Sequence, residues 1–414
     1  MQPSESSHGT TQLLAIFISV LLFILLFIGS AIAQTEKVLY SFRGGADGTN
    51  PSTGLVADAA GNLFGTTTDG GSGACTGGCG IVYELKPSPG GGWTETVIYS
   101  FQGPDGAAPA AGLIFDQAGN LYGTTLSGGK YHDGTVFKLT PFRGAWTETV
   151  LHTFTNNDGA YPAASLIFDK AGNLYGTTLF GGPTRGGTVF QLTLSGGVWT
   201  ETVLHSFTGR NDGIDPAASL ILDQNGALYG TTMGDNIFKL APPAPGHTKW
   251  TLKTLYAFGG GPNRGPLSAG TLLAGKNGVL YGTQKYGGGP ANAGAVFQLT
   301  PPAHHGAWTE TTIYSFAGGS DGLYPRAGVI ADGAGNLYGT TAGDDQNSRG
   351  TVFKLTPPAQ QGGNWTKTTL HAFTGGNDGS GPSAGLIFGK GGVLYSTTAG
   401  GGSSGKGTVF KIVP

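Results

Sequence analysis

Charged side chains are scarce in this sequence. Asp, Glu, Lys and Arg together make up 11% of the 414 residues, and the formal net charge is −2. No long basic or acidic run stands out at either end. A protein that binds nucleic acid needs a dense basic face to neutralise phosphates, so the composition argues against a nucleic-acid partner.

Cysteine is nearly absent too. The two cysteines, Cys75 and Cys79, stand in the short motif CTGGC. In an exported protein such a pair predicts a local disulfide that closes one loop. A metal site is the alternative, but two thiols without a nearby histidine supply few ligands.

Long apolar runs are absent except at the N-terminus. Residues 13–33 are almost continuously apolar and end in Ala31-Ile32-Ala33, which has the A-x-A pattern of a signal-peptide cleavage site. Residues 1–33 are therefore predicted to be a signal peptide, and the mature protein to be secreted, periplasmic or on the cell surface. Residues 1–12 contain no Lys or Arg, and 21 apolar residues could span a bilayer, so an inner-membrane anchor formed by residues 13–33 is the alternative. A membrane partner is expected only if this segment stays uncleaved.

Glycine, by contrast, is abundant, with 78 residues at fixed offsets between short apolar runs. The clearest unit is residues 112–125, GLIFDQAGNLYGTT, which predicts two strands joined by a tight turn. The Asp of this turn, Asp116, recurs in most copies and is predicted to cap the turn. Similar units begin near Gly54, Ser165, Ser219, Thr271, Gly328 and Gly385.

Each round of the repeat contains four strand-like pieces, here named A to D. The patterns are GLIFD for A, NLYGTT for B, GTVFKLTP for C and WTETVIYSF for D, and rounds recur every 52 to 58 residues. Strict alternation in the D piece at 93–101 predicts that Trp93, Glu95, Val97, Tyr99 and Phe101 share one face. The six tryptophans each open a D piece, and their periodicity indicates blade packing. Seven rounds of four antiparallel strands predict an all-β fold, a seven-bladed β-propeller.

The two ends of the repeat region complement each other. The last round stops after strand C, at residues 407–414, whereas residues 34–42 match strand D and precede the first round. We therefore expect the N-terminal strand, Gln34 to Phe42, to complete the last blade and close the ring, giving one propeller over residues 34–414. Closure also removes exposed sheet edges.

The recurring pattern, Gly-Leu-Ile-x-Asp-x-x-Gly-Asn-Leu-Tyr-Gly-Thr-Thr followed by Gly-Thr-Val-Phe-Lys-Leu-Thr-Pro, resembles the GloVer tandem repeat of exported bacterial choice-of-anchor proteins. The resemblance covers residues 34–414 and implies an exported compartment, but it implies no reaction. Strands A and B are also similar to those of NHL-type propellers, which implies that A is the innermost strand.

Function is expected where the repeat breaks down on the face formed by the D-to-A and B-to-C loops. Asp-Gly recurs in the D-to-A loops, where turn formation is favoured over a calcium site because each loop offers about one carboxylate. The short B-to-C loop of round four and the altered round five mark the first place to search for a ligand. The candidate ligand-binding residues are Tyr131, His132, Arg185, Asp235, Arg264, Lys285, Tyr286, Asp344 and Asp345.

No catalytic motif rises above the repeat. The histidines do not form a triad or a metal-ligand set, and no phosphate-binding loop is present. The sequence favours a non-enzymatic exported binding or scaffold protein whose ligand is a glycan or a protein. The alternative is a hydrolase or lyase that acts on a carbohydrate or lactone in the central pocket. No cofactor is expected, with calcium kept open.

Overall fold

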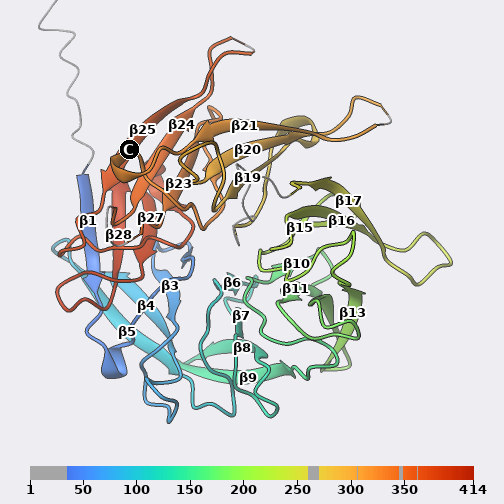
Figure 1. Ribbon diagram of the computed structural model, residues 1–414. Coiled ribbons are helices and arrows are strands. Elements are labelled where there is room, and N and C mark those ends of the chain that lie inside the picture. Colours follow the sequence, from blue (N-terminus) through green and yellow to red (C-terminus); the bar gives the residue numbers. More distant parts are fainter. Residues whose placement is uncertain (1–34, 260–269, 305, 345–347, 361) are drawn as a thin grey trace, which may run out of the picture. The chain divides into compact units, whose positions relative to one another are not determined.

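Seven four-stranded antiparallel sheets are arranged as blades around a ring in the computed structural model (Figure 1). The structure describes residues 35–259, 270–304, 306–344, 348–360 and 362–414. Glu36–Pro414 forms one compact unit. The predicted leader, residues 1–33, lies outside the described residues. In the part that is described, no helix has the length and apolarity needed to cross a membrane.

The strands follow the predicted A-to-D order in every blade. The A strands are β2 (Val56–Ala57), β6 (Ile114–Phe115), β10 (Ile167–Phe168), β14 (Ile221–Leu222), β18 (Leu273–Ala274), β22 (Ile330–Ala331) and β26 (Ile387–Phe388). The B strands are β3 (Leu63–Thr67), β7 (Leu121–Thr125), β11 (Leu174–Thr178), β15 (Leu228–Thr231), β19 (Leu280–Gln284), β23 (Leu337–Thr341) and β27 (Leu394–Thr398).

The C and D strands form the outer half of each blade. The C strands are β4 (Ile81–Pro87), β8 (Thr135–Phe142), β12 (Thr188–Ser195), β16 (Asn236–Ala241), β20 (Ala295–Thr300), β24 (Thr351–Thr356) and β28 (Thr408–Val413). The D strands of blades 1 to 6 are β5 (Trp93–Ser100), β9 (Ala145–Thr153), β13 (Val198–Ser206), β17 (Thr251–Ala257), β21 (Thr309–Ser315) and β25 (Thr366–Ala372). Four short 3-10 turns complete the described elements: η1 (Gly45–Asp47), η2 (Lys276–Gly278), η3 (Gly319–Asp321) and η4 (Lys390–Gly392).

Blade 7 is completed from the other end of the chain, as predicted. Its strand order is β1-β28-β27-β26, so β1 (Thr35–Ser41) is its D strand. The Phe42 N–H donates to the Gly407 carbonyl at 3.0 Å, and the fully buried Phe42 ring lies 5.0 Å from the ring of Tyr83 in blade 1. The N-terminal strand thus joins the last blade and also packs against the first.

Strict alternation along strand D is wrong. A β-bulge interrupts the pairing of C with D; in blade 1, Val82 pairs with Tyr99 whereas Tyr83 pairs with Val97. Because the extra residue reverses the faces, Trp93 and Val97 pack toward blade 7 and Tyr99 and Phe101 pack toward blade 2. The same shift occurs in every described C–D pair of blades 1 to 6. Each D strand therefore supplies side chains to two interfaces between blades.

The tryptophans are packing residues, as their periodicity indicates. Trp146 of blade 2 makes an edge contact with Phe64 of blade 1, with ring centroids 6.0 Å apart. The same contact to the B-strand aromatic residue of the preceding blade is made by Trp93, Trp199, Trp250 and Trp365. The turn aspartates also have their predicted role, because Asp116 accepts hydrogen bonds from the Ala118 and Asn120 N–H groups at 2.9 Å.

Buried threonine hydroxyls link six of the blades to the next one near the centre of the ring. The first threonine of the B-strand Thr-Thr pair donates to a carbonyl just before the A strand of the following blade. Between blades 7 and 1 the Thr397 hydroxyl donates to the Thr53 carbonyl at 3.1 Å, joining residues 344 positions apart. We refer to these bonds as the threonine belt.

Removing one hydroxyl from the threonine belt should weaken ring closure measurably. Thr397→Val keeps the side-chain volume but leaves the Thr53 carbonyl without this donor, which should cost about 1–2 kcal/mol of unfolding free energy. Urea denaturation would measure the loss. Thr96→Val, on the exposed side of β5, is the control and should have little effect. Equal midpoints for the two variants would contradict a structural role for the belt.

Candidate functional site

The D-to-A and B-to-C loops meet on one face of the ring, which we call the loop face. Isolated β-bridges join the two loops within a blade, as in Ala160 with Phe180 and Ser380 with Gly400. The loop face is therefore a connected surface on which side chains of the two loop types lie side by side.

In six of the blades, within the residues that the structure describes, one loop residue is held in a left-handed backbone conformation directly before a proline. Tyr161 illustrates the arrangement: its N–H donates to the Asp133 carbonyl at 2.9 Å, and its own carbonyl accepts from Leu179 at 3.1 Å. The positive φ angles are 60° at Asn50, 52° at Ala108, 57° at Tyr161, 54° at Asp215, 60° at Tyr324 and 63° at Gly381. This conformation costs a non-glycine residue about 1–2 kcal/mol. The backbone is thus fixed while the side chain varies from blade to blade.

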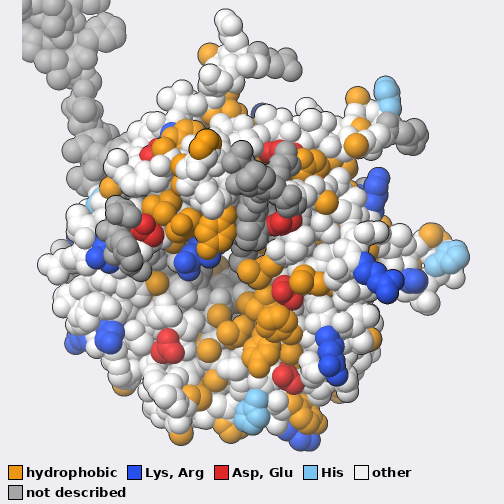
Figure 2. Space-filling model, viewed as in Figure 1, with side chains coloured by type: hydrophobic (Ala, Val, Ile, Leu, Met, Phe, Trp, Pro, Cys, Tyr) orange, Lys and Arg blue, Asp and Glu red, His pale blue; other side chains and the backbone are white. Residues whose placement is uncertain are grey.

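Exposed apolar side chains gather on the loop face of blades 2 to 4. The apolar patch consists of Tyr131, Tyr161, Phe180, Ile214 and Met233, which are 37–48% exposed. The Tyr161 and Phe180 rings meet edge to face with centroids 5.8 Å apart. Figure 2 shows hydrophobic side chains gathered beside the centre of the ring, over β10 and β11 of Figure 1. Such gatherings on a soluble protein mark interaction sites.

The central channel opens on the same face as a cavity of about 250 Å³. Small residues from the start of each A strand line it, among them Ser52, Ala110, Ala163 and Ser383. Arg326 of blade 6 stands where the other described blades have serine or alanine, and it is the one charged residue of the described lining.

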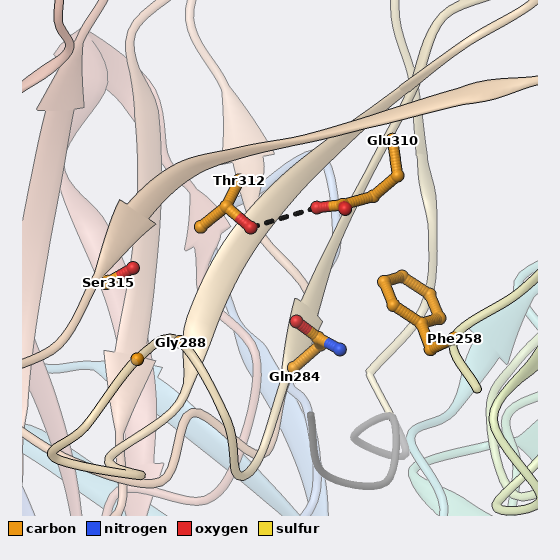
Figure 3. A pocket seen from close by; sticks show the side chains of 7 residues that line it. Phe258, Gln284, Gly288, Glu310, Thr312 and Ser315 are labelled. Atoms are coloured by element: carbon orange, nitrogen blue, oxygen red, sulfur yellow. Dashed lines mark hydrogen bonds between the residues drawn. The ribbon is translucent and has the colours of Figure 1, made fainter. Parts of the chain in front are cut away.

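A further pocket of about 360 Å³ lies where blade 5 meets blade 4, and we call it the blade-five pocket (Figure 3). Its lining consists of Phe258, Gln284, Gly288, Gly289, Glu310, Thr312 and Ser315. Gln284 is only 4% exposed, and its Nε2 has no hydrogen-bond partner. The Thr312 hydroxyl donates to Glu310 Oε1 at 3.0 Å. The pocket therefore presents an unused amide donor beside a carboxylate.

The interfaces between blades hold pairs of carboxyl groups. The closest set is His152, Asp158 and Glu201, whose ligand atoms all lie within 4.8 Å of one another. It is the one such group among the residues that the structure describes, and it could hold a divalent metal ion. At the equivalent place between blades 7 and 1, a Tyr40 hydroxyl donates to Asp47 Oδ1 at 2.5 Å. The histidine therefore takes the place of a structural hydrogen-bond donor.

Burial changes the acidity of the glutamates at these interfaces. It raises the pKa of Glu201 to about 8, with a further contribution from the negative charge of Asp158. Burial likewise raises the pKa of Glu95 and of Glu148 to about 7, each beside a neighbouring aspartate. One carboxylate oxygen of each of these glutamates is buried without a hydrogen-bond partner. These glutamates are tied to blade packing rather than to the channel.

A sequence comparison decides the family. The model of the Gloeobacter/Verrucomicrobia repeat matches residues 26–240 and 236–414. The chain belongs to this repeat family. The resemblance to GloVer repeats is thereby confirmed. No curated protein sequence matches the chain.

This Gloeobacter/Verrucomicrobia repeat protein also resembles solved structures in its fold. The extracellular domain of a candidate hybrid two-component system from B. thetaiotaomicron aligns with a TM-score of 0.53 and 13% identity, covering 92% of this chain and 41% of that chain. A candidate 6-phosphogluconolactonase from Bacteroides uniformis aligns with a TM-score of 0.50 and 16% identity, covering 81% and 88%. Identities this low show a shared fold and nothing finer.

The residues selected from breaks in the Gloeobacter/Verrucomicrobia repeat lie on different blades. His132 and Arg185 occupy the same left-handed turn position, three residues before strand C, in blades 2 and 3. Asp235 directly precedes β16, with φ of 67°. The Lys285 ammonium lies 4.7 Å from the Tyr286 ring centroid, and that ring packs on Tyr324.

The remaining selected residues are placed as follows. Tyr131 belongs to the apolar patch, and the Lys130 ammonium lies 5.1 Å from its ring centroid. Asp344 Oδ1 accepts a hydrogen bond from the Ser348 N–H at 3.0 Å within one loop. Arg264 and Asp345 lie outside the described residues. Cys75 and Cys79 form a disulfide with Cα atoms 5.1 Å apart.

Several side chains with a prominent place on the loop face were not selected from the sequence. Tyr161, Phe180 and Arg326 look like ordinary loop variation, although Arg326 is a charged residue at a position of small ones. The sequence marks Gln284 more clearly. Gln284 replaces the second threonine of the Thr-Thr pair, and Ala295 replaces the strand-C threonine that pairs with it in other blades.

Proposed function

We propose that the chain is an exported, non-enzymatic binding protein whose ligand is a neutral carbohydrate held on the loop face. The observation that carries the proposal is the apolar patch with its exposed rings at Tyr131, Tyr161 and Phe180. Aromatic faces suit the C–H surfaces of sugar rings, and their polar tips suit the hydroxyl groups. The low net charge fits a neutral ligand.

Export is supported by two features of the chain. Residues 1–33 have the composition of a signal peptide, with an anchor formed by residues 13–33 as the alternative. The Cys75–Cys79 disulfide suits an oxidising compartment, because disulfides are rare in the cytosol. We expect the mature protein to be secreted, periplasmic or displayed at the cell surface.

The geometry gives less support to a hydrolase or lyase in the central channel. Hydrolysis of a glycoside calls for a pair of carboxyl groups flanking the bond, and a lactone also needs a general base. Within the described part of the channel lining there is no carboxylate and no imidazole, and Arg326 supplies positive charge alone. A binding role requires no such groups.

Substitution of the patch rings should remove glycan binding. We expect Tyr161→Ala and Phe180→Ala each to weaken binding at least about tenfold. A ligand ring that stacks on an aromatic side chain contributes roughly 1–3 kcal/mol to binding. A glycan array with residues 34–414 identifies the ligand, and calorimetry measures the affinities.

The control is Phe142→Ala, which removes a ring that is even more exposed, at 64%, from the hairpin of β8 and β9 on the opposite face. It should bind the glycan like the wild type. If the wild-type protein binds no glycan on the array, or if Phe142→Ala is as impaired as the patch variants, the proposal is wrong.

A further inference from the structure

We propose that the blade-five pocket is a second subsite, which holds a single neutral sugar unit through Gln284 and Glu310. This inference rests on the proposed carbohydrate-binding function. It states that one sugar unit of the ligand binds to residues that lie outside the apolar patch. The pocket is built from strand ends of blades 4 and 5, and its volume of about 360 Å³ lies within the usual range for small-ligand sites.

The floor of the pocket departs from the repeat in a paired way. In blade 2 the Thr125 and Thr135 hydroxyls lie 2.8 Å apart and satisfy each other, and blades 3, 6 and 7 repeat this pair. In blade 5 the two positions are Gln284 and Ala295, which pair across β19 and β20. The longer side chain faces a shorter one, so the amide has no partner across the strands.

The buried amide is the feature that indicates a ligand. Gln284 is only 4% exposed, and its Nε2 donates to no protein group. Figure 3 shows the side chain pointing into the hollow between Glu310 and Phe258. A buried donor that is left unsatisfied destabilises the fold, and an acceptor atom of a ligand would remove that cost.

In blades 2 and 3 a turn glycine of the protein covers the threonine that is equivalent to Gln284. The glycine of the Asp-Gly turn lies against the equivalent threonine, so that a Cβ atom on Gly106 would come within 2.6 Å of Thr125 and one on Gly159 within 2.6 Å of Thr178. The sequence leading into blade 5 lacks Asp-Gly and reads Pro262-Asn263-Arg264-Gly265. The sequence before blade 5 thus departs from the repeat, as Gln284 and Ala295 do.

The chemistry of the lining selects the ligand class. The Gln284 amide requires an acceptor, the Glu310 carboxylate accepts from a donor, and a sugar hydroxyl can serve as either. Thr312 and Ser315 add exposed hydroxyls at the rim. The carboxylate disfavours an anionic sugar, so a neutral hexose or N-acetylhexosamine fits and a uronic acid does not.

The test uses soluble glucose, galactose, mannose, N-acetylglucosamine and glucuronic acid, with binding followed by saturation-transfer NMR and calorimetry. The wild-type protein should bind at least one neutral sugar and bind glucuronic acid at least about tenfold more weakly. The double variant Gln284→Thr/Ala295→Thr restores the repeat's hydroxyl pair, so it should fold normally and weaken monosaccharide binding about tenfold.

Glu310→Gln and Glu148→Gln form a matched pair. Both substitutions are isosteric and lie at the same place in strand D, on β21 and β9, but only Glu310 lines the pocket. Glu310→Gln should weaken monosaccharide binding, and Glu148→Gln should leave it unchanged. Full affinity in the double variant or equal effects of the matched pair would overturn the inference.

The outcomes separate this inference from the broader proposal. If the glycan binds, Tyr161→Ala abolishes binding and the Gln284 variant binds like the wild type, the loop face binds carbohydrate but the pocket does not. If neither glycans nor monosaccharides bind the wild-type protein, both ideas are wrong. If monosaccharides bind through Gln284 while Tyr161→Ala and Phe180→Ala have no effect, the subsite stands and the patch assignment fails.

Discussion

Deletion of residues 34–42 should lower the melting temperature by about 10 °C or more. The deletion removes β1, which leaves β28 as an open edge in blade 7. It also removes the fully buried Phe42 ring, whose loss alone should cost about 3–5 kcal/mol. Circular dichroism or calorimetry on the deleted chain would measure the change.

The appropriate reference is a chain that begins at residue 34, which lacks the leader but keeps β1. A synthetic peptide of residues 34–42, added in excess to the deleted chain, should restore part of the lost stability by binding beside β28. A melting curve that the deletion leaves unchanged would refute closure of the ring by this strand.

Raising the pH from 5 to 8 should destabilise the protein, and substitution of three glutamates should reduce this dependence. Glu36 and Glu95 have pKa values raised to about 7, chiefly by burial, and Glu148 and Glu201 are shifted in the same direction. Because the folded protein holds protons that the unfolded chain releases near its ordinary pKa of 4.5, unfolding releases protons across this interval. Stability is therefore highest near pH 5 and falls as the pH rises through 7 and 8.

The triple variant Glu95→Gln/Glu148→Gln/Glu201→Gln should melt about 5 °C higher than the wild type at pH 8 and nearly equally at pH 5, after allowance for solvent screening. Thermal melts at the two pH values give the comparison. A triple variant with an unaltered pH dependence would show that these carboxyl groups do not govern it.

Blade 6 supplies a contrast at the same interface position. Lys367 takes the place of the glutamate, and its ammonium lies 2.8 Å from Asp321 Oδ1. There the opposite charges attract. Burial alone would raise the pKa of Asp321, but hydrogen bonds from Lys367 and the Ala317 N–H outweigh this effect and lower the pKa. Lys367→Gln should accordingly lower the melting temperature at both pH values, whereas the glutamate substitutions raise it at pH 8.

The sequence was sufficient for the architecture because each blade repeats the same local signals. The Asp-x-Ala-Gly-Asn turn and the short β-branched runs determine the number of blades, and the match of residues 34–42 to strand D determines closure. The bulge in strand D was missed because the inserted residue, such as Ile98, is an ordinary β-former and leaves no mark in the pattern. Its effect appears only when the two halves of the strand are seen to face different blades.

The candidate site was harder to predict for a physical reason. The left-handed positions of the loop face accept Asn, Ala, Tyr and Asp, because hydrogen bonds from two loops hold the backbone whatever the side chain. The residue type alone therefore does not identify these left-handed positions. At the break in round five the sequence singles out Lys285 and Tyr286, whereas the buried amide of Gln284 lines the pocket. Strand register decides which of these three consecutive side chains points inward.

The pairing of β1 with β28 in blade 7 makes the chain suited to circular permutation. Strand β28 ends, and strand β1 begins, on the side of blade 7 where the other blades have a C-to-D hairpin. A short linker could therefore join Pro414 to residue 35. New termini could then be placed in an exposed hairpin such as Gly196-Gly197, between β12 and β13. The order of blades along the chain would change while every interface stayed the same, and fusion partners could be attached at any chosen blade.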